Sequence, residues 1–260
     1  MQNIVGQPKL MALLNSYTLQ TLPKTLLFIG PAGCGKHTIT NYIVNRFKFD
    51  FVELDSGVSS EEINEFLYKT INTLYLIDLD KFTEKQQNQF LKFIEEPSKT
   101  VYIVLIASSE VGVLNTILNR CVKHTFEPYS KAEIEQITNT RVNDLAFEIF
   151  KTPGKLLNLT NDSFNAIMDL ANKVVHETCS TAYANVLALA TKINYKDIYN
   201  KVDFNLFFDA VAYTAFESFK ATNSKHSIRS IYFLFGQRRL SGTGCHRTLI
   251  SKSAYPQCRH

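Results

Sequence analysis

The chain has 260 residues, of which 45% are hydrophobic and 20% are charged, a balance typical of a globular protein with about one to three compact units. No apolar run is long enough to span a membrane, and the first twenty residues lack the features of a secretory signal, so we expect no membrane contact. The five cysteines are scattered and form no CxxC pair, which argues against a disulfide framework and against a zinc site. A reducing, cytoplasmic setting fits this cysteine usage best.

The net charge of +4 is unevenly distributed along the chain. The last acidic residue is Glu217, and the stretch from Lys220 to Arg259 holds eight basic residues and no acidic one. Such a stretch is either a contact for nucleic acid or an acidic partner, or a solvated chain end. Because its last twenty residues show no periodicity, we expect residues 237–260 to form a basic, disordered tail.

Short runs rich in β-branched and aromatic residues alternate with helix-like runs over the first half of the chain. Strands are predicted at 26–30, 50–55, 73–78, 100–108 and, with a weaker signal, 122–126; helices are predicted at 37–47, 59–71 and 83–97. The third and fourth strands are apolar on both faces, which is the pattern of a buried parallel sheet. Ser59 precedes Glu62 with the spacing of a capping box. This alternation predicts an α/β domain over residues 1–127 with a parallel, doubly wound sheet and a ligand site at the carboxyl ends of its strands.

Strand signals fade after Pro128. Residues 128–161 contain three short helix-like runs, which predict a small helical domain. Residues 162–236 are largely helical in pattern and predict a further helical region.

The stretch GPAGCGKHT, residues 30–38, follows a predicted strand and opens a predicted helix, which is the context of a phosphate-binding loop. Glycines let backbone N–H groups converge on phosphate oxygens, the helix amino end favours negative charge, and Lys36 neutralises the terminal phosphates. His37, however, stands where a Ser or Thr usually binds magnesium, and magnesium prefers oxygen ligands. Thr38 is one residue too late, because a helix turns by about 100° per residue.

A working ATPase site also needs an Asp at the end of the third strand and a neighbouring Glu that activates water. The strand LYLID ends in Asp78, followed by Leu79 and Asp80. A second alignment places Asp78 in the Glu position and Ile77 in the Asp position. Neither alignment yields an adjacent Asp–Glu pair.

Four stretches carry a resemblance to the clamp-loader branch of the AAA+ ATPases, in particular to the delta-prime and gamma subunits of bacterial DNA polymerase III and their viral relatives. They are IVGQ (4–7), GPAGCGKHT (30–38), NQFLKFIEEPSKTVYIVLIASSE (88–110) and LNTILNRC (114–121). The third resembles the family's NALLKxLEEPP followed by its sensor strand, and the fourth its TIxSRC motif, with Asn119 in place of Ser.

The resemblance implies an AAA+ P-loop domain, a small helical lid domain and a helical collar-like region. It implies a site for ATP or ADP, with magnesium possible and no zinc, formed by Val5, Gly30, Pro31, Ala32, Gly33, Cys34, Gly35, Lys36, His37 and Thr38. Asp78 would belong to the metal shell, and Ser108 or Ser109 would be the first sensor. Arg120 would be an arginine finger that reaches a neighbouring subunit's site. The implied partners are other clamp-loader subunits, the sliding clamp and, through the assembly, primer–template DNA.

The chain also departs from the family. The magnesium hydroxyl and the catalytic Glu are missing, and the second sensor Arg falls on Gly154 or Lys155. Three interpretations remain open: a delta-prime-like stator with weak or no hydrolysis of its own, an active ATPase subunit of the same assembly, and an unrelated P-loop enzyme.

Overall fold

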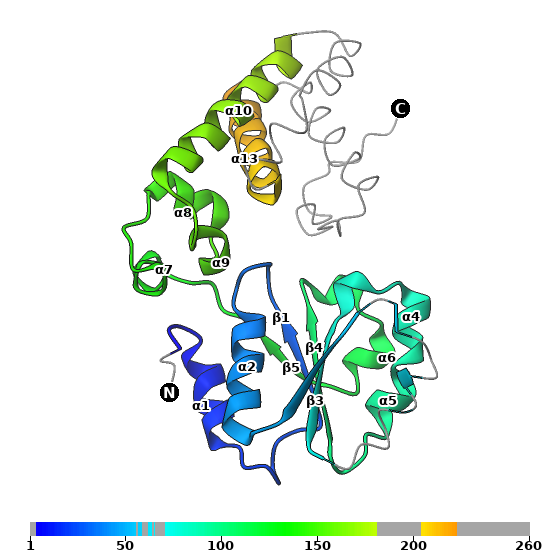
Figure 1. Cartoon of the computed structure of the whole chain (residues 1–260). Helices are drawn as coiled ribbons and strands as arrows, with labels where there is room; N and C mark the ends of the chain where they lie inside the picture. Colours follow the sequence, from blue (N-terminus) through cyan, green and yellow to red (C-terminus); the bar gives the residue numbers. More distant parts are fainter. Residues whose placement is uncertain are drawn as a thin grey trace. The chain divides into compact units, whose positions relative to one another are not determined.

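The computed structural model describes residues 4–55, 57–58, 62–63, 65, 71–180 and 204–222 (Figure 1). It divides the chain into two compact units, with the boundary between Tyr129 and Ser130. The predicted basic tail, most of the helix at 59–71 and its Ser59 cap lie outside the described residues. The domain boundaries predicted near residues 161 and 236 stay predictions.

The first unit is built on a five-stranded parallel sheet with the order β2-β3-β4-β1-β5. Its strands are β1 (Thr25–Ile29), β2 (Asp50–Leu54), β3 (Thr73–Asp78), β4 (Val101–Ala107) and β5 (Val122–Thr125). All five strands were predicted, and their ends differ from the predictions by at most one residue. β1 and β4 are fully buried along their length, which explains their continuous apolar sequences.

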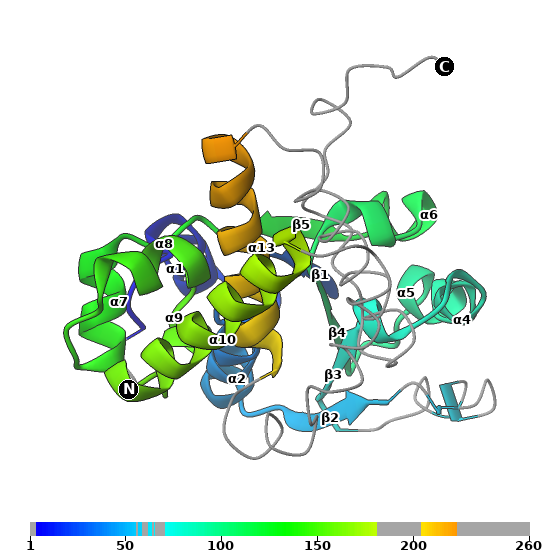
Figure 2. The same cartoon turned by 90° about the horizontal axis from the view of Figure 1, so that it is seen from above.

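Helices cover both faces of the sheet (Figures 1 and 2). Helices α1 (Pro8–Ser16) and α2 (Lys36–Phe47) lie on one side, and α4 (Glu84–Gln89), α5 (Leu91–Glu95) and α6 (Asn115–Leu118) lie on the other. Two 3-10 turns, η1 (Leu79–Lys81) and η2 (Glu110–Gly112), follow β3 and β4. The first unit is therefore an α/β domain with a parallel sheet covered by helices on both faces (Figure 1), as the sequence indicates.

The single helix predicted at 83–97 is interrupted, and this prediction was wrong in detail. The chain forms α4 and α5 with a break at Phe90, whose N–H donates to the Gln87 carbonyl at 3.1 Å. Phe90 is fully buried and meets the Phe82 ring edge-on, with the ring centroids 5.1 Å apart. The break lets Phe90 pack inward while Phe93 and Ile94 also reach the core.

Gln87 is a buried polar side chain that ties three segments of the first unit together. Its amide nitrogen donates to the carbonyls of Gly112 at 2.9 Å and Phe82 at 3.3 Å, and its amide oxygen accepts the Leu114 N–H at 3.2 Å. Because a buried amide is costly to leave unpaired, these bonds fix the loops after β3 and β4 against α4.

The second unit is helical in its described part. It contains α7 (Lys131–Thr138), α8 (Asp144–Phe150), α9 (Pro153–Leu156), α10 (Asn161–Ser180) and α13 (Phe204–Thr222). Helix α7 starts with a complete capping box between Ser130 and Glu133, and these bonds from Ser130 hold the pKa of the Glu133 carboxyl below its usual range.

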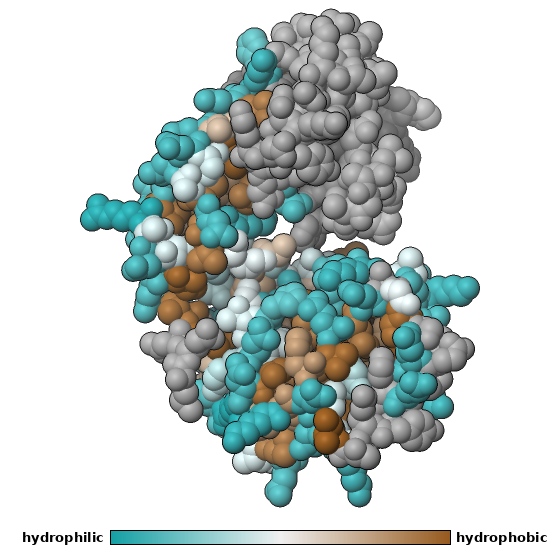
Figure 3. Space-filling model, in the orientation of Figure 1, coloured by the Kyte–Doolittle hydropathy of each residue, from teal (hydrophilic) through white to brown (hydrophobic). Residues whose placement is uncertain are grey.

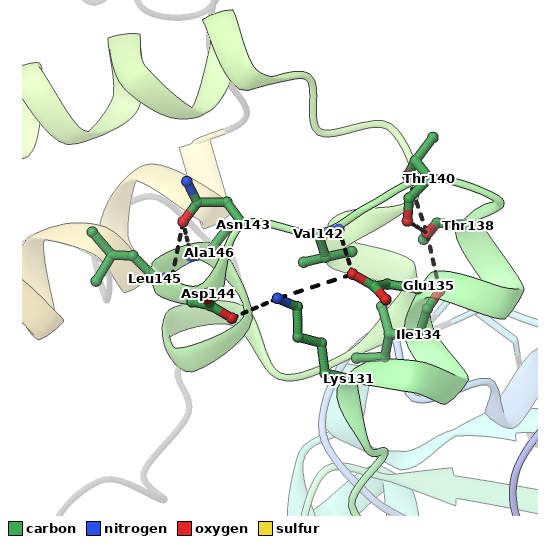
Figure 4. A network of polar contacts seen from close by, with 10 residues as sticks. All are labelled: Lys131, Ile134, Glu135, Thr138, Thr140, Val142, Asn143, Asp144, Leu145 and Ala146. Atoms are coloured by element: carbon green, nitrogen blue, oxygen red, sulfur yellow. Dashed lines mark hydrogen bonds and ion pairs between the residues drawn. The ribbon is translucent and has the colours of Figure 1, made fainter.

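A polar network holds α7 to α8 (Figure 4). Lys131 pairs with Asp144 and, at 3.9 Å, with Glu135, whose carboxylate accepts the Val142 N–H at 3.0 Å. Asn143 caps α8 by accepting the N–H groups of its first turn. Hydrophilic side chains occupy much of the surface in Figure 3, and none of the helices in the described ranges is long and apolar enough to cross a bilayer.

Candidate nucleotide site

The glycine-rich loop connects the carboxyl end of β1 to the amino end of α2. Gly33 and Gly35 adopt positive φ angles of 80° and 97°, a conformation that side chains rarely tolerate. Gly35 is the amino-terminal cap of α2, so the loop turns sharply and leaves the first N–H groups of the helix free to face an anion. Among the predicted loop residues, Pro31, Ala32 and Gly33 are exposed. This geometry fits the phosphates of a nucleotide.

Lys36 is buried at the start of α2. Its ammonium group donates to the carbonyl oxygens of Gly30 and, at 3.2 Å, of Pro31. The neighbouring Cys34 is also buried, and burial raises the pKa of its thiol, against a smaller opposing effect of the Lys36 charge. The loop therefore holds a buried ammonium group next to a buried thiol.

The IVGQ segment is joined to the loop through residues that the sequence alone did not single out. Gln7 exchanges two hydrogen bonds with the backbone of Glu127, donating to its carbonyl at 2.7 Å and accepting its N–H at 2.8 Å. The ring of Tyr129 lies so close to Gly6, which has a φ of 78°, that an added Cβ would sit 2.5 Å from the ring. The Tyr129 hydroxyl donates to the Cys34 carbonyl at 2.9 Å. Tyr129 thus contacts both segments: its ring packs against the amino-terminal segment next to Val5, and its hydroxyl is hydrogen-bonded to the phosphate loop.

Asp78 lies at the carboxyl end of β3 with its side chain 20% exposed. Burial, and then the charge of Asp80, raise the pKa of the Asp78 carboxyl, while Lys81, the Asp80 N–H and Lys36 act in the opposite direction. Asp78 ends β3 and the loop follows β1, and because these strands are parallel, both lie at the same edge of the sheet. Ile77 is fully buried in the core cluster, so the second alignment also places no carboxylate there.

Ser108, the candidate first sensor, follows the end of β4. Its N–H donates to the Asp80 carboxylate at 2.9 Å, and its hydroxyl donates to the same oxygen. Asp80 is therefore the acidic partner of Ser108, a pairing that the sequence did not predict.

His37 and Thr38 are both exposed in the first turn of α2. The His37 ring nitrogen lies 3.7 Å from the Glu53 carboxylate, and Lys81 lies 3.7 Å from the same carboxylate and 3.8 Å from Asp78. Within the described ranges, no three His, Cys, Asp or Glu side chains come together as a metal-binding group. Magnesium takes oxygen ligands, but His37 offers an imidazole, and the carboxylates of Asp78 and Glu53 both face the Lys81 ammonium, so this donor set does not fit the ion.

Arg120 lies directly after α6, away from these residues. Its Nε is 2.6 Å from the Glu95 carboxylate of α5, and its Nη1 donates to the Thr116 carbonyl at 2.8 Å. Its side chain is 40% exposed. Glu95 belongs to the EEP stretch of the sequence, but its pairing with Arg120 could not be read from spacing.

The sheet places Arg120 at the edge opposite to the phosphate loop. Arg120 comes just before β5, and Val122 at the start of β5 pairs with Leu26 near the start of parallel β1. The loop instead follows Ile29 at the far end of β1. Four residues of strand span about 13 Å, so the backbone of Arg120 and the phosphate loop lie at opposite edges of the sheet.

In the second unit, the candidate second sensor Lys155 is engaged by α13. Its ammonium group lies 2.7 Å from the Asp209 carboxylate, and both side chains are 22% exposed. This pairing gives Lys155 a structural role within its own unit.

Parts of the chain are similar to known proteins. A family described as "DNA polymerase III, delta subunit" matches residues 59–130. The chain is 36% identical over 76 residues to DNA polymerase III subunit delta' of Bacillus subtilis (strain 168), a match that covers 29% of this chain and 23% of that protein. It is 24% identical over 152 residues to the replication factor C small subunit of Natronomonas pharaonis, covering 52% of this chain and 47% of that protein.

The chain thus spans less than half the length of these two curated relatives. Among solved structures, a mutant of Thermotoga maritima RuvB matches with a TM-score of 0.54 and 13% identity, covering 85% of this chain and 97% of that chain, which is a likeness of fold. Together these matches confirm the resemblance to clamp-loader AAA+ subunits.

Proposed function

We propose that this chain, whose sequence resembles those of clamp-loader subunits, acts as a delta-prime-like stator in a DNA replication complex. In this role it binds other clamp-loader subunits and helps to load a sliding clamp onto primer–template DNA. It offers Arg120 to the ATP site of a neighbouring subunit and hydrolyses little or no ATP itself.

The observation that carries this proposal is the position of Arg120. The guanidinium lies at the sheet edge opposite to its own phosphate loop, so it cannot serve that loop, yet it is exposed enough to reach a neighbour. A planar guanidinium grips phosphate oxygens in a bidentate way, and a finger supplied in trans accelerates hydrolysis by about 10³- to 10⁵-fold.

The chain's own site supports the stator over an active ATPase subunit. His37 replaces the magnesium hydroxyl, and Leu79, which follows Asp78, is buried where a water-activating carboxylate is needed. An active subunit remains the alternative, with Asp78 or Asp80 taking on more of the chemistry. An unrelated P-loop enzyme is a third candidate that no specific contact favours.

The test reconstitutes the clamp loader with Arg120→Ala, Arg120→Lys or Glu95→Gln in this chain and measures DNA-stimulated ATP hydrolysis. We expect Arg120→Ala to slow hydrolysis by about 10²-fold or more, with Arg120→Lys giving little rescue because a lysine cannot form the bidentate contact.

Glu95→Gln is the matched control, because it removes the same ion pair but keeps the finger. We expect it to retain hydrolysis and to change stability by less than about 1 kcal/mol, since the pair is solvent-exposed. An unchanged rate with Arg120→Ala contradicts the finger. An equal loss with Glu95→Gln shows that the ion pair, and not the finger, matters.

A further inference from the structure

A lysine lies between two carboxylates on the acidic side of the candidate nucleotide site. Lys81 follows Asp78 in the η1 turn, and its ammonium nitrogen is 3.8 Å from the Asp78 carboxylate. It is also 3.7 Å from the carboxylate of Glu53, on the neighbouring strand β2. Glu53 in turn lies 3.7 Å from His37, at the amino end of α2. These four polar side chains follow one another across the ends of β2 and β3 and the amino end of α2.

The backbone of η1 holds Lys81 in place. The residues on either side of its turn, Leu79 and Phe82, are buried in the core at 1% and 6% exposure. The Phe82 N–H donates to the Leu79 carbonyl at 3.1 Å, and the Asp80 N–H donates to the Asp78 side chain at 3.3 Å. These contacts hold the backbone of Lys81 next to the site, while its side chain is about half exposed.

The cluster binds a positive charge but lacks the ligands of a magnesium ion. His37 provides an imidazole where an oxygen is needed, and both carboxylates already face the ammonium of Lys81. An ammonium group is a compact charge with three N–H donors on a flexible stem. It can therefore leave one of these carboxylates and pair with a phosphate oxygen instead, without the strict octahedral geometry of magnesium.

We propose that Lys81 supplies the positive charge that a divalent cation would otherwise supply, so that this chain binds nucleoside di- or triphosphates without magnesium. The inference rests on the proposed nucleotide site at Lys36 and the glycine loop. It deepens the stator function, because an ammonium group neutralises phosphate charge but does not generate the activated water that hydrolysis needs. The bound nucleotide then acts as a lasting structural ligand.

The experiment titrates a fluorescent ATP analogue against the purified full chain, once in EDTA and once in excess magnesium. We expect the wild-type Kd to agree within about twofold between the two conditions, because no divalent ion takes part in binding. Lys81→Met keeps most of the side-chain length and removes the charge. It should weaken binding in EDTA by roughly tenfold, the lower end of what a hydrogen bond to a charged group contributes.

Lys85→Met is the matched control, since Lys85 is an exposed lysine on α4 only four residues away. It should bind the analogue like the wild type. Far-UV circular dichroism and urea unfolding check that Lys81→Met folds, which is expected because half-exposed ion pairs contribute little stability.

Three results overturn the proposal. The first is a wild-type Kd that is tenfold lower in magnesium than in EDTA. The second is an unchanged Kd for Lys81→Met in EDTA, and the third is no binding of the analogue under either condition. The Arg120 test is independent of these results, because it measures ATP hydrolysis by the assembled loader at a neighbouring subunit's site. Failure of the lysine proposal and failure of the stator proposal are therefore distinguishable.

Discussion

Replacing Tyr129 by Phe tests whether the phosphate loop is held in shape by a contact far away in the sequence. The substitution keeps the aromatic ring against Gly6 and removes only the hydroxyl that donates to the Cys34 carbonyl at 2.9 Å. Both partners are buried, with Tyr129 at 9% and Cys34 at 2% exposure. The change therefore keeps the ring packing and removes the hydroxyl that contacts the loop.

The expected magnitude follows from this burial. A typical hydrogen bond contributes about 0.5–1.5 kcal/mol to stability, and a carbonyl left unpaired in the interior costs about 1–3 kcal/mol. We expect Tyr129→Phe to lower the free energy of opening of the first unit by about 1–2 kcal/mol. Because the same bond holds the loop ready for phosphate, nucleotide affinity should fall by up to about tenfold.

Tyr102→Phe is the matched control. The Tyr102 hydroxyl donates to the Leu19 carbonyl at 3.0 Å in the segment between α1 and β1, outside the phosphate loop. Hydrogen exchange of peptides from β1 and β4 reports the opening of the first unit separately from the second. Both variants should exchange faster than the wild type, but only Tyr129→Phe should bind the ATP analogue more weakly.

Wild-type exchange rates and affinity in Tyr129→Phe, with faster exchange in Tyr102→Phe, would refute this reasoning. The loop would then keep its shape through its own backbone. Equal losses of nucleotide affinity in both variants would show that general destabilisation, and not the loss of the Tyr129 hydroxyl, weakens binding.

Two further changes test the buried polar groups of the first unit. Gln87→Leu leaves the Leu114 N–H and the Gly112 carbonyl without their partner, so we expect the free energy of unfolding in urea to fall by about 2 kcal/mol. Asn88→Leu, on the exposed side of α4, is the control and should cost much less. Equal losses in the two variants would contradict the role of the buried bonds. Burial raises the pKa of Asp78, so its contribution to stability is present below the ordinary carboxyl pKa and is lost as pH rises. Asp78→Asn should therefore stabilise the chain more at pH 7 than at pH 4, and unfolding curves that show the opposite trend would mean that the pairing with Lys81 outweighs burial.

Local sequence signals were enough to predict the sheet and the loop. A fully buried strand such as β4 needs an unbroken apolar run, and a turn with positive φ at Gly33 and Gly35 needs glycine, so both leave a mark within a few neighbouring residues. The helix at 83–97 was less predictable, because its break falls at Phe90, which packs against Phe82 and is not a helix-breaking residue.

The partners of the candidate site residues depend on tertiary structure. Cys34 and Tyr129 are 95 positions apart in the sequence, and Ser108 and Asp80 are 28 apart. Such pairs form because parallel strands carry their ends to a common edge, and the side chains that meet there depend on strand order and register.

Arg120 shows most clearly what sequence and tertiary structure each determine. The sequence singles it out as a candidate, because it lies in the stretch LNTILNRC (114–121). Its pairing with Glu95 and its place at the edge opposite to its own loop exist only once β5 has paired with β1. The sequence alone thus determines residue type and local backbone conformation. Which partners a charged side chain can reach depends on the strand order and register of the sheet.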